Sequence, residues 1–131
     1  MPNQPKKKSK GPSPTARSMQ HLRDLGWIVA KVEQRLPIPG KFVTRDCFNI
    51  GDLLCADPTM GIALIQVTTN SNLAAHFTKA VSIKELRTWL LAGGKFILHG
   101  WSKKGARGEA KRWTLTERTV GLGDIPDEPA K

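Results

Sequence analysis

The chain has 131 residues, 39% of them hydrophobic, and carries a formal net charge of +10 at pH 7 with a sequence pI near 10.1. This length allows one domain with a hydrophobic core and excludes two domains of ordinary size. Apolar stretches are shorter than the ~18 residues of a membrane-spanning helix, and no apolar run follows the basic N-terminus as in a secretory signal. We therefore expect a cytoplasmic protein without membrane contact.

The two ends of the chain differ in composition from its middle. Residues 1–14 are rich in lysine and proline, and residues 121–131 offer little apolar surface for a core. Segments of this kind bury too little surface to offset the entropy of ordering. The sequence therefore predicts a disordered basic tail over 1–14, a folded domain over 15–120 and a second disordered tail over 121–131.

The positive charge is clustered, which indicates a nucleic-acid partner, because grouped Lys and Arg release counterions from a phosphate backbone. One cluster is the lysine run at 6–10 and the other is the glycine-containing segment 103–112. We expect DNA contacts from Lys79, Lys103, Lys104, Arg107, Lys111 and Arg112. The alternative interpretation of the second cluster is a hairpin loop in contact with solvent only. The two tryptophans that flank it, Trp101 and Trp113, are expected to lie in the core.

The N-terminal third predicts a helix followed by a strand. Ser13 suits an N-cap and Pro14 suits the first helical position. Apolar residues then recur every three positions up to the stop signal Gly26, which predicts a helix over 14–25. Residues 27–32 are apolar and β-branched, which is typical of a strand.

The middle of the chain predicts two further strands joined by a tight turn. Residues 36–40, Leu-Pro-Ile-Pro-Gly, predict a break in the chain. Residues 47–56 then predict a strand, 57–61 a turn with Pro and Gly, and 62–69 a nearly all-apolar central strand.

The C-terminal half predicts a helical crossover and two more strands. Helices are expected over 73–80 and 83–92, the second ending at a pair of glycines. Strands are expected over 95–101 and 112–120, with the basic loop 102–111 between them. The order α-β-β-β-α(α)-β-β predicts an α/β fold with a mixed sheet flanked by helices.

Neither a disulfide nor structural zinc is expected. Cys47 and Cys55 fall in one predicted strand, where eight residues at ~3.3 Å each hold them ~26 Å apart. They are interpreted as small buried residues in a reducing compartment. His21, His76 and His99 are scattered along the chain, without the spacing of a zinc motif.

Three polar residues interrupt the apolar strands at related positions. Asp52 lies within Asn-Ile-Gly-Asp-Leu-Leu, where an unpaired carboxylate is costly to bury. Gln66 and Thr68 interrupt the next strand and have the same parity, so their side chains leave the same face. A hairpin centred near 58–60 places Asp52 opposite them, at a strand end beside a helix N-terminus.

This arrangement resembles the PD-(D/E)xK nuclease superfamily, which includes restriction enzymes, Mrr-like nucleases and archaeal and phage Holliday-junction resolvases. The resemblance covers about residues 15–120, and the residues that match the motif of the superfamily are Gly51-Asp52 and Gln66-Val67-Thr68. The string 45–54, Arg-Asp-Cys-Phe-Asn-Ile-Gly-Asp-Leu-Leu, is also similar to a segment of small phage-type nucleases that carry two aspartates at this separation. It implies a restriction-endonuclease-like fold, catalytic roles for Asp52, Gln66, Thr68 and Asp46, and a homodimer.

The resemblance also implies a Mg²⁺ (or Mn²⁺) site held by Asp52, the Gln66 side-chain oxygen and the Val67 carbonyl. Asp46 or Glu33 is a second acid for this site, although six residues of strand put Asp46 ~20 Å from Asp52 unless the chain bends. We favour an ordinary surface carboxylate for Glu33. Gln66 stands where most members have an acid.

Thr68 stands where the superfamily has a lysine, and a hydroxyl cannot supply its positive charge. Lys79 or Lys84 is a possible substitute. The resemblance therefore implies a metal-dependent endodeoxyribonuclease acting on duplex or branched DNA, such as a Holliday-junction resolvase, in a host cytoplasm if the chain is phage-encoded. A catalytically decayed DNA-binding module is the alternative, and a small RNA-binding protein is a third reading.

Overall fold

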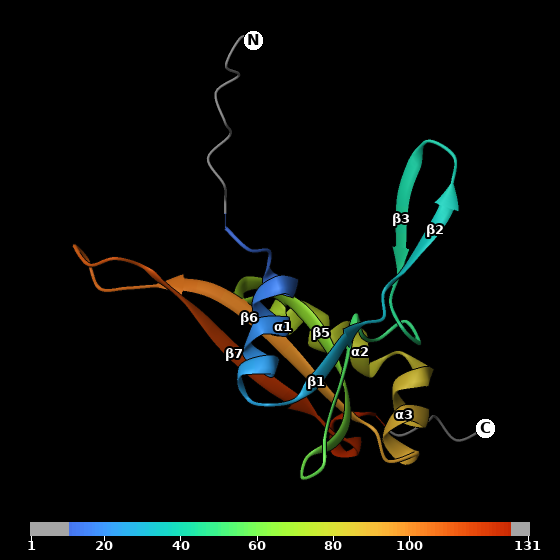
Figure 1. Ribbon diagram of the computed structural model, residues 1–131. Helices are drawn as coiled ribbons and strands as arrows, with labels where there is room; N and C mark the ends of the chain where they lie inside the picture. The colour runs from blue at the N-terminus through green and yellow to red at the C-terminus, as the bar shows by residue number, and fades with distance from the viewer. Residues whose placement is uncertain (1–10, 127–131) are drawn as a thin grey trace.

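A computed structural model describes residues 11–126 and shows an α/β fold built on a mixed sheet (Figure 1). The helices are α1 (Pro14–Asp24), α2 (Leu73–Val81) and α3 (Lys84–Leu91), with short 3₁₀ helices η1 (Asn70–Asn72) and η2 (Leu122–Asp124). The strands are β1 (Ile28–Lys31), β2 (Gln34–Ile38), β3 (Lys41–Arg45), β4 (Leu53–Asp57), β5 (Gly61–Thr69), β6 (Lys95–Lys104) and β7 (Arg112–Val120).

The central sheet has five strands in the order β1-β4-β5-β6-β7. Only β5 and β6 pair in parallel, and the other three neighbours are antiparallel. A parallel pair needs a long crossover, which η1, α2 and α3 provide between β5 and β6. The predicted mixed sheet flanked by helices is confirmed.

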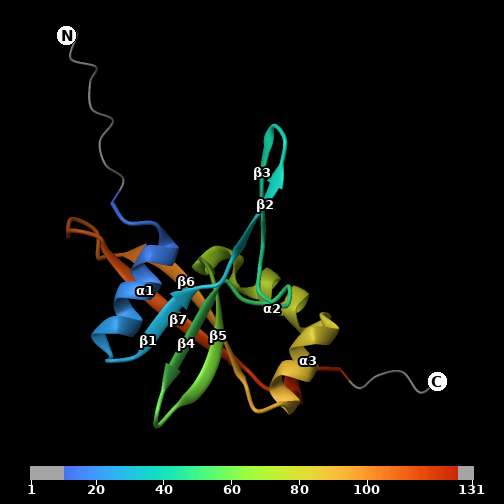
Figure 2. The same ribbon diagram turned by 45° about the vertical axis from the view of Figure 1, so that its right-hand side comes forward.

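Helices cover the two faces of this sheet, as the two views show (Figures 1 and 2). On one face Leu22 of α1 packs on strand residues that include Leu53 and Ile65. On the other face Leu86 of α3 packs in a core with Leu64, Phe96 and Leu98. Leu64 and Ile65 are adjacent on β5 and serve opposite faces, as the two-residue period of a strand requires. The apolar character of the predicted central strand is explained by this double cover.

The segment after β1 contradicts the predicted break over 36–40. Residues 34–38 and 41–45 pair as a separate two-stranded hairpin, β2–β3, in which Ile38 lies opposite Lys41. Pro39 and Gly40 are the two central residues of its turn, and Gly40 has φ 75°. Proline followed by a residue of positive φ is the pattern of a type II turn. The prolines therefore shape a hairpin that projects from the sheet (Figure 2).

The predicted strand over 47–56 is wrong in its first half. Strand β4 begins at Leu53, and the chain before it bends sharply, so Phe48 and Asp52 do not share a strand face. Cys47 lies in this bend and Cys55 is buried in β4, and both are free thiols. The long separation predicted from one continuous strand therefore does not apply.

Some of the predicted tail residues belong to the fold. Residues 121–126 contain η2, and Ile125 packs against the core on the α2–α3 face. Their inclusion corrects the domain limit at 120. The lysine run at 6–10 and residues 127–131 lie outside the described residues. Within the described part of the chain, no helix is long and apolar enough to cross a membrane.

Candidate metal centre

The bend before β4 is a tight turn, and one of its two central residues rarely adopts the backbone conformation that the turn requires. Ile50 N–H donates to the Cys47 carbonyl (3.0 Å), and Cys47 N–H donates to the Gly51 carbonyl (2.7 Å). Phe48 and Asn49 between them have φ values of 53° and 62°. Two consecutive residues of positive φ make a type I′ turn, which asparagine tolerates and phenylalanine adopts only under strain. Strain of this kind concentrates at functional sites.

Gly51 lets this bend lie against β5. A Cβ atom at Gly51 would lie 2.9 Å from the Cβ of Leu64, closer than real Cβ contacts allow. The close approach fixes the next residue, because Asp52 N–H donates to the Ile65 carbonyl (2.9 Å). The glycine therefore positions the Asp52 side chain at the start of β4, beside the middle of β5.

Three carboxylates meet at the start of β4. Glu33, between β1 and β2, Asp46, directly after β3, and Asp52, directly before β4, each offer an oxygen within 4.8 Å of the others. The backbone joins two of these segments, since Val32 N–H donates to the Asp52 carbonyl (3.0 Å). Carboxylate oxygens are the preferred ligands of hard divalent cations. This acid cluster, defined as Glu33, Asp46 and Asp52, can therefore hold a metal ion.

Asp52 is the buried member of the acid cluster, with 5% of its surface exposed. Its Oδ1 accepts the Val67 N–H (3.2 Å). Burial raises the pKa of Asp52 to about 7, with the charge of Asp46 acting in the same direction and the Val67 hydrogen bond opposing it. Burial beside a second carboxylate thus favours the protonated form of Asp52, whereas a bound cation would favour the ionised form.

Asp46 is connected to β5 by an amide. In the orientation that satisfies both of its neighbours, the Gln66 amide nitrogen donates to Asp46 Oδ2 (2.9 Å) and to the Ile50 carbonyl (2.7 Å). Burial and then the charge of Glu33 raise the pKa of Asp46, while Lys79, His76 and the Gln66 hydrogen bond lower it. The balance again favours a cation at the cluster.

Asp46 is the member of the acid cluster that lines a cleft between the β2–β3 hairpin and the helices α2 and α3. This open cleft has a volume of about 750 Å³ and is lined by Asp46, Arg45, Lys79 and Lys84 among others. A smaller hollow of about 30 Å³ adjoins it, with Gln66, His76 and Lys79 among its lining residues. Cations on the wall of a cleft that contains a carboxylate site suit an anionic substrate.

The structure brings most of the predicted site residues together. Asp46, Asp52 and Gln66 are neighbours, and the bend over 46–51 removes the ~20 Å separation expected for a straight strand. Glu33, expected to be an ordinary surface carboxylate, belongs to the cluster instead. Thr68 lies two residues beyond Gln66 on the same face of β5, outside the cluster.

The predicted DNA-contacting residues divide into two groups. Lys79 on α2 lies at the acid cluster. Lys103 and Lys104 at the end of β6, Arg107 and Lys111 in the loop, and Arg112 at the start of β7 are exposed on a second projecting hairpin (Figure 1). At its base Trp113 is 36% exposed and packs under Arg17 (4.2 Å to the ring centroid), contrary to the predicted core position, whereas Trp101 is buried.

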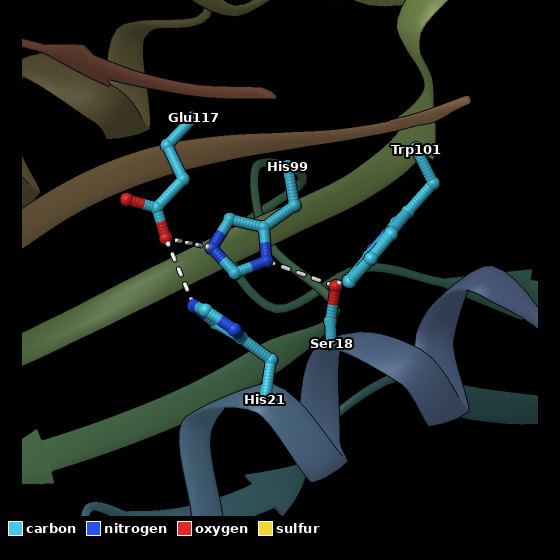
Figure 3. Close-up of polar contacts among 5 residues, drawn as sticks. All are labelled: Ser18, His21, His99, Trp101 and Glu117. Atoms are coloured by element: carbon cyan, nitrogen blue, oxygen red, sulfur yellow. Dashed lines mark hydrogen bonds and ion pairs between the residues drawn. The ribbon is translucent and has the colours of Figure 1, made fainter. Parts of the chain in front are cut away.

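Sequence reasoning missed two groups of polar residues. His76 lies three residues before Lys79 on α2, a helical spacing that places both on one face and was a usable signal. His21, His99 and Glu117 also meet, on the α1 face of the sheet (Figure 3). Their sequence separation gave no signal, because the contact depends on how α1 packs.

Comparison of the chain with protein-family models, curated proteins and solved structures gives no match.

Proposed function

We propose that the chain is a Mg²⁺-dependent endodeoxyribonuclease of the restriction-endonuclease-like fold, related to PD-(D/E)xK enzymes and acting on duplex or branched DNA as a homodimer. The observation that carries the proposal is the acid cluster around the buried Asp52, with Gln66 beside it on the neighbouring strand. The element order of the sheet and the basic surface agree with it.

The residues present fit Mg²⁺ or Mn²⁺. The donors are oxygens of Asp52, Asp46 and Glu33, which lie within 4.8 Å of one another and are of the type that these ions prefer. Gln66 directs its amide nitrogen, and not the predicted oxygen, toward Asp46 Oδ2, so it serves this site by positioning a ligand. Val67 directs its N–H toward Asp52, and in a strand the C=O of a residue points to the same side as its N–H.

When bound, the metal would polarise the scissile phosphate and lower the pKa of a water molecule for attack on phosphorus. The protein's own residues orient the substrate. Lys79 contributes positive charge beside Asp46, while Thr68 supplies none from β5. Gln66 holds Asp46 in place through its hydrogen bond.

The two projecting hairpins support DNA as the substrate. The β2–β3 hairpin carries Arg35, Lys41 and Arg45, and the β6–β7 hairpin carries the basic residues of 103–112. They extend from different parts of the sheet with α1 between them in Figures 1 and 2. Contacts of such residues with phosphates position a duplex without reading its sequence.

The proposal predicts cleavage that depends on a divalent metal. The chain is incubated with a labelled four-way junction, a plain duplex and a single strand, each with Mg²⁺, with Mn²⁺ and with EDTA. We expect nicked or cut products from the junction or the duplex with metal, and none with EDTA. Absence of metal-dependent cleavage of all three substrates by the folded protein would contradict the proposal.

Thr68 favours a second candidate, a nuclease fold that binds DNA without cutting it. Replacing Thr68 with lysine restores the positive charge at this position and is expected to raise cleavage by about 100-fold, the effect of one well-placed electrostatic group. The matched control is Thr69→Lys, since Thr69 is exposed and its side chain leaves the opposite face of β5. Rates are measured on the best substrate of the assay above.

The two candidates give different results in this experiment. Equal rates for Thr68→Lys, Thr69→Lys and the natural chain would show that position 68 does not limit cleavage. Salt-sensitive DNA binding without cleavage by any of the three would identify the binding module.

A further inference from the structure

Trp113, at the base of the β6–β7 hairpin, differs from its neighbour Trp101 on the same face of the sheet. Trp101 is buried and donates its indole N–H to Ser18 Oγ (2.8 Å) (Figure 3). Trp113 is 36% exposed, and among the described residues its indole N–H has no hydrogen-bond partner. A buried tryptophan usually pairs its N–H, whereas one with a free N–H keeps that edge in solvent. Trp113 therefore presents an aromatic ring at the surface.

Two cations lie against the Trp113 ring. The guanidinium carbon of Arg17 on α1 is 4.2 Å from the ring centroid, and Nζ of Lys103, opposite Trp113 on β6, is 5.2 Å from it. Within the described part of the chain, neither cation forms an ion pair with a carboxylate. Stacking of this kind keeps a guanidinium flat, with N–H groups at its edge that bind phosphate well. Arg17, Lys103 and Trp113 are defined here as the Trp113 platform.

The surroundings of the Trp113 platform are hollowed and basic. An open depression of about 550 Å³ is lined by Trp113, Arg17 and Arg23 among others. Asp24, which also lines it, accepts a hydrogen bond from Gln20 (2.8 Å). The hairpin above adds further exposed cations, namely Lys104, Arg107, Lys111 and Arg112. A depression of this size accommodates a ligand as large as a nucleotide, and the positive charge suits phosphate groups.

We propose that the Trp113 platform binds an unpaired nucleotide of a DNA strand. The base would extend the stack of indole and guanidinium, as bases do on aromatic rings and on arginine planes. Arg17, Lys103 and the basic residues of the hairpin would bind the phosphates on either side. Phosphate contacts alone carry no information about pairing, whereas a stacked base must be free of its partner. The platform therefore favours unpaired DNA over a plain duplex.

The Trp113 platform and the acid cluster lie on opposite faces of the sheet, near the same end of it. Gln66, which contacts Asp46, pairs with Leu98 on β6, and Lys103 lies farther along that strand. A duplex at the acid cluster and a single strand at the platform would thus meet at a branch point. This consequence rests on the proposed function, whereas binding of an unpaired nucleotide does not.

Fluorescence anisotropy in EDTA tests the proposal with a labelled oligothymidylate of about twelve nucleotides, within the site sizes of single-strand-binding folds. The comparison probes are an abasic strand of the same length, which has the phosphates without the bases, and a plain duplex. We expect the natural chain to bind the oligothymidylate at least about tenfold more tightly than the abasic strand, the effect of one base stack. EDTA prevents metal-dependent cleavage, so the result is readable whether or not the chain is a nuclease.

Variants assign the binding to the platform. Trp113→Ala should weaken binding of the oligothymidylate about tenfold and leave the other two probes unchanged, and Trp113→Phe should keep most of the affinity. Lys103→Ala should weaken binding of all three probes, because it removes a phosphate contact. The matched control is Lys95→Ala, since Lys95 is an exposed lysine on the same face of β6 at its other end. Circular dichroism shows that each variant is folded.

The fluorescence of Trp113 gives a second readout, which a purely structural role would not move. Stacking of a base should quench it, so Trp113→Phe should bind the oligothymidylate with much less quenching than the natural chain. The proposal is overturned if the natural chain binds the oligothymidylate and the abasic strand equally, if quenching is the same in Trp113→Phe, or if Lys95→Ala weakens binding as much as Lys103→Ala. Tighter binding of an oligouridylate than of the oligothymidylate would overturn the assignment to DNA.

Discussion

Replacing Asp52 with asparagine is expected to reduce metal-dependent DNA cleavage by at least about 100-fold, since even indirect support of a metal ligand is worth 10- to 100-fold. Asp52 is the buried centre of the acid cluster, and an amide in its place donates hydrogen bonds where a cation needs an anionic oxygen. DNA affinity should be unchanged or slightly higher, because the substitution removes a negative charge. Single-turnover rates and a binding titration measure the two quantities separately.

The matched control for this prediction is Asp24→Asn. Asp24 is an exposed aspartate at the end of α1, which packs on the other face of the sheet, and it should tolerate the change without loss of cleavage. Asp46→Asn and Glu33→Gln extend the test to the rest of the acid cluster. Full cleavage by Asp52→Asn would place the reaction elsewhere and would contradict the proposed function.

The same carboxylate should make the metal-free protein less stable as the pH rises. The pKa of Asp52 is raised from its ordinary value of 3.8 to about 7 in the fold, so the native state binds more protons than the unfolded state between these values. The free energy of unfolding therefore falls as the pH increases from about 4 to about 7, and the full loss remains above 7. At 1.36 kcal/mol per pKa unit, the loss is on the order of 4 kcal/mol.

Urea unfolding in EDTA at a series of pH values measures this dependence. Asp52→Asn should remove most of it and be more stable than the natural chain above pH 7, leaving a smaller slope from Asp46, whose pKa is also raised. Mg²⁺ should restore the stability of the natural chain at high pH and have little effect on the variant. A natural chain whose stability in EDTA does not change between pH 4 and 7 would show that Asp52 is adequately neutralised by the protein itself.

The strand pattern was enough to find half of the candidate site. Apolar runs bounded by turn residues predicted β5, and parity along it predicted that Gln66 and Thr68 share a face. The interruption of an apolar segment by Asp52 predicted an unusual carboxylate, which the burial and the raised pKa confirm. These features are local, so they can be read from neighbouring residues.

The position of Asp46 could not be read in this way. Its approach to Asp52 depends on positive φ at Phe48 and Asn49, and phenylalanine gives no signal for such a conformation because it rarely adopts it. The β2–β3 hairpin was hidden for a related reason, since Pro37 within β2 argues against a strand and is tolerated in this isolated two-stranded hairpin. Tertiary packing decides both conformations.

The three carboxylates of the acid cluster come from three segments of the chain. The β2–β3 hairpin separates Glu33 from Asp46, and a tight turn separates Asp46 from Asp52. In a contiguous binding loop, the ligands are close even in the unfolded chain. Here Glu33, Asp46 and Asp52 meet only after β1 has paired with β4. The cluster therefore forms together with the pairing of β1 and β4, and a metal ion would recognise the assembled sheet and hardly bind the denatured ensemble. The apparent affinity for the ion therefore depends on the fraction of folded molecules, and binding of the ion in turn raises the free energy of unfolding.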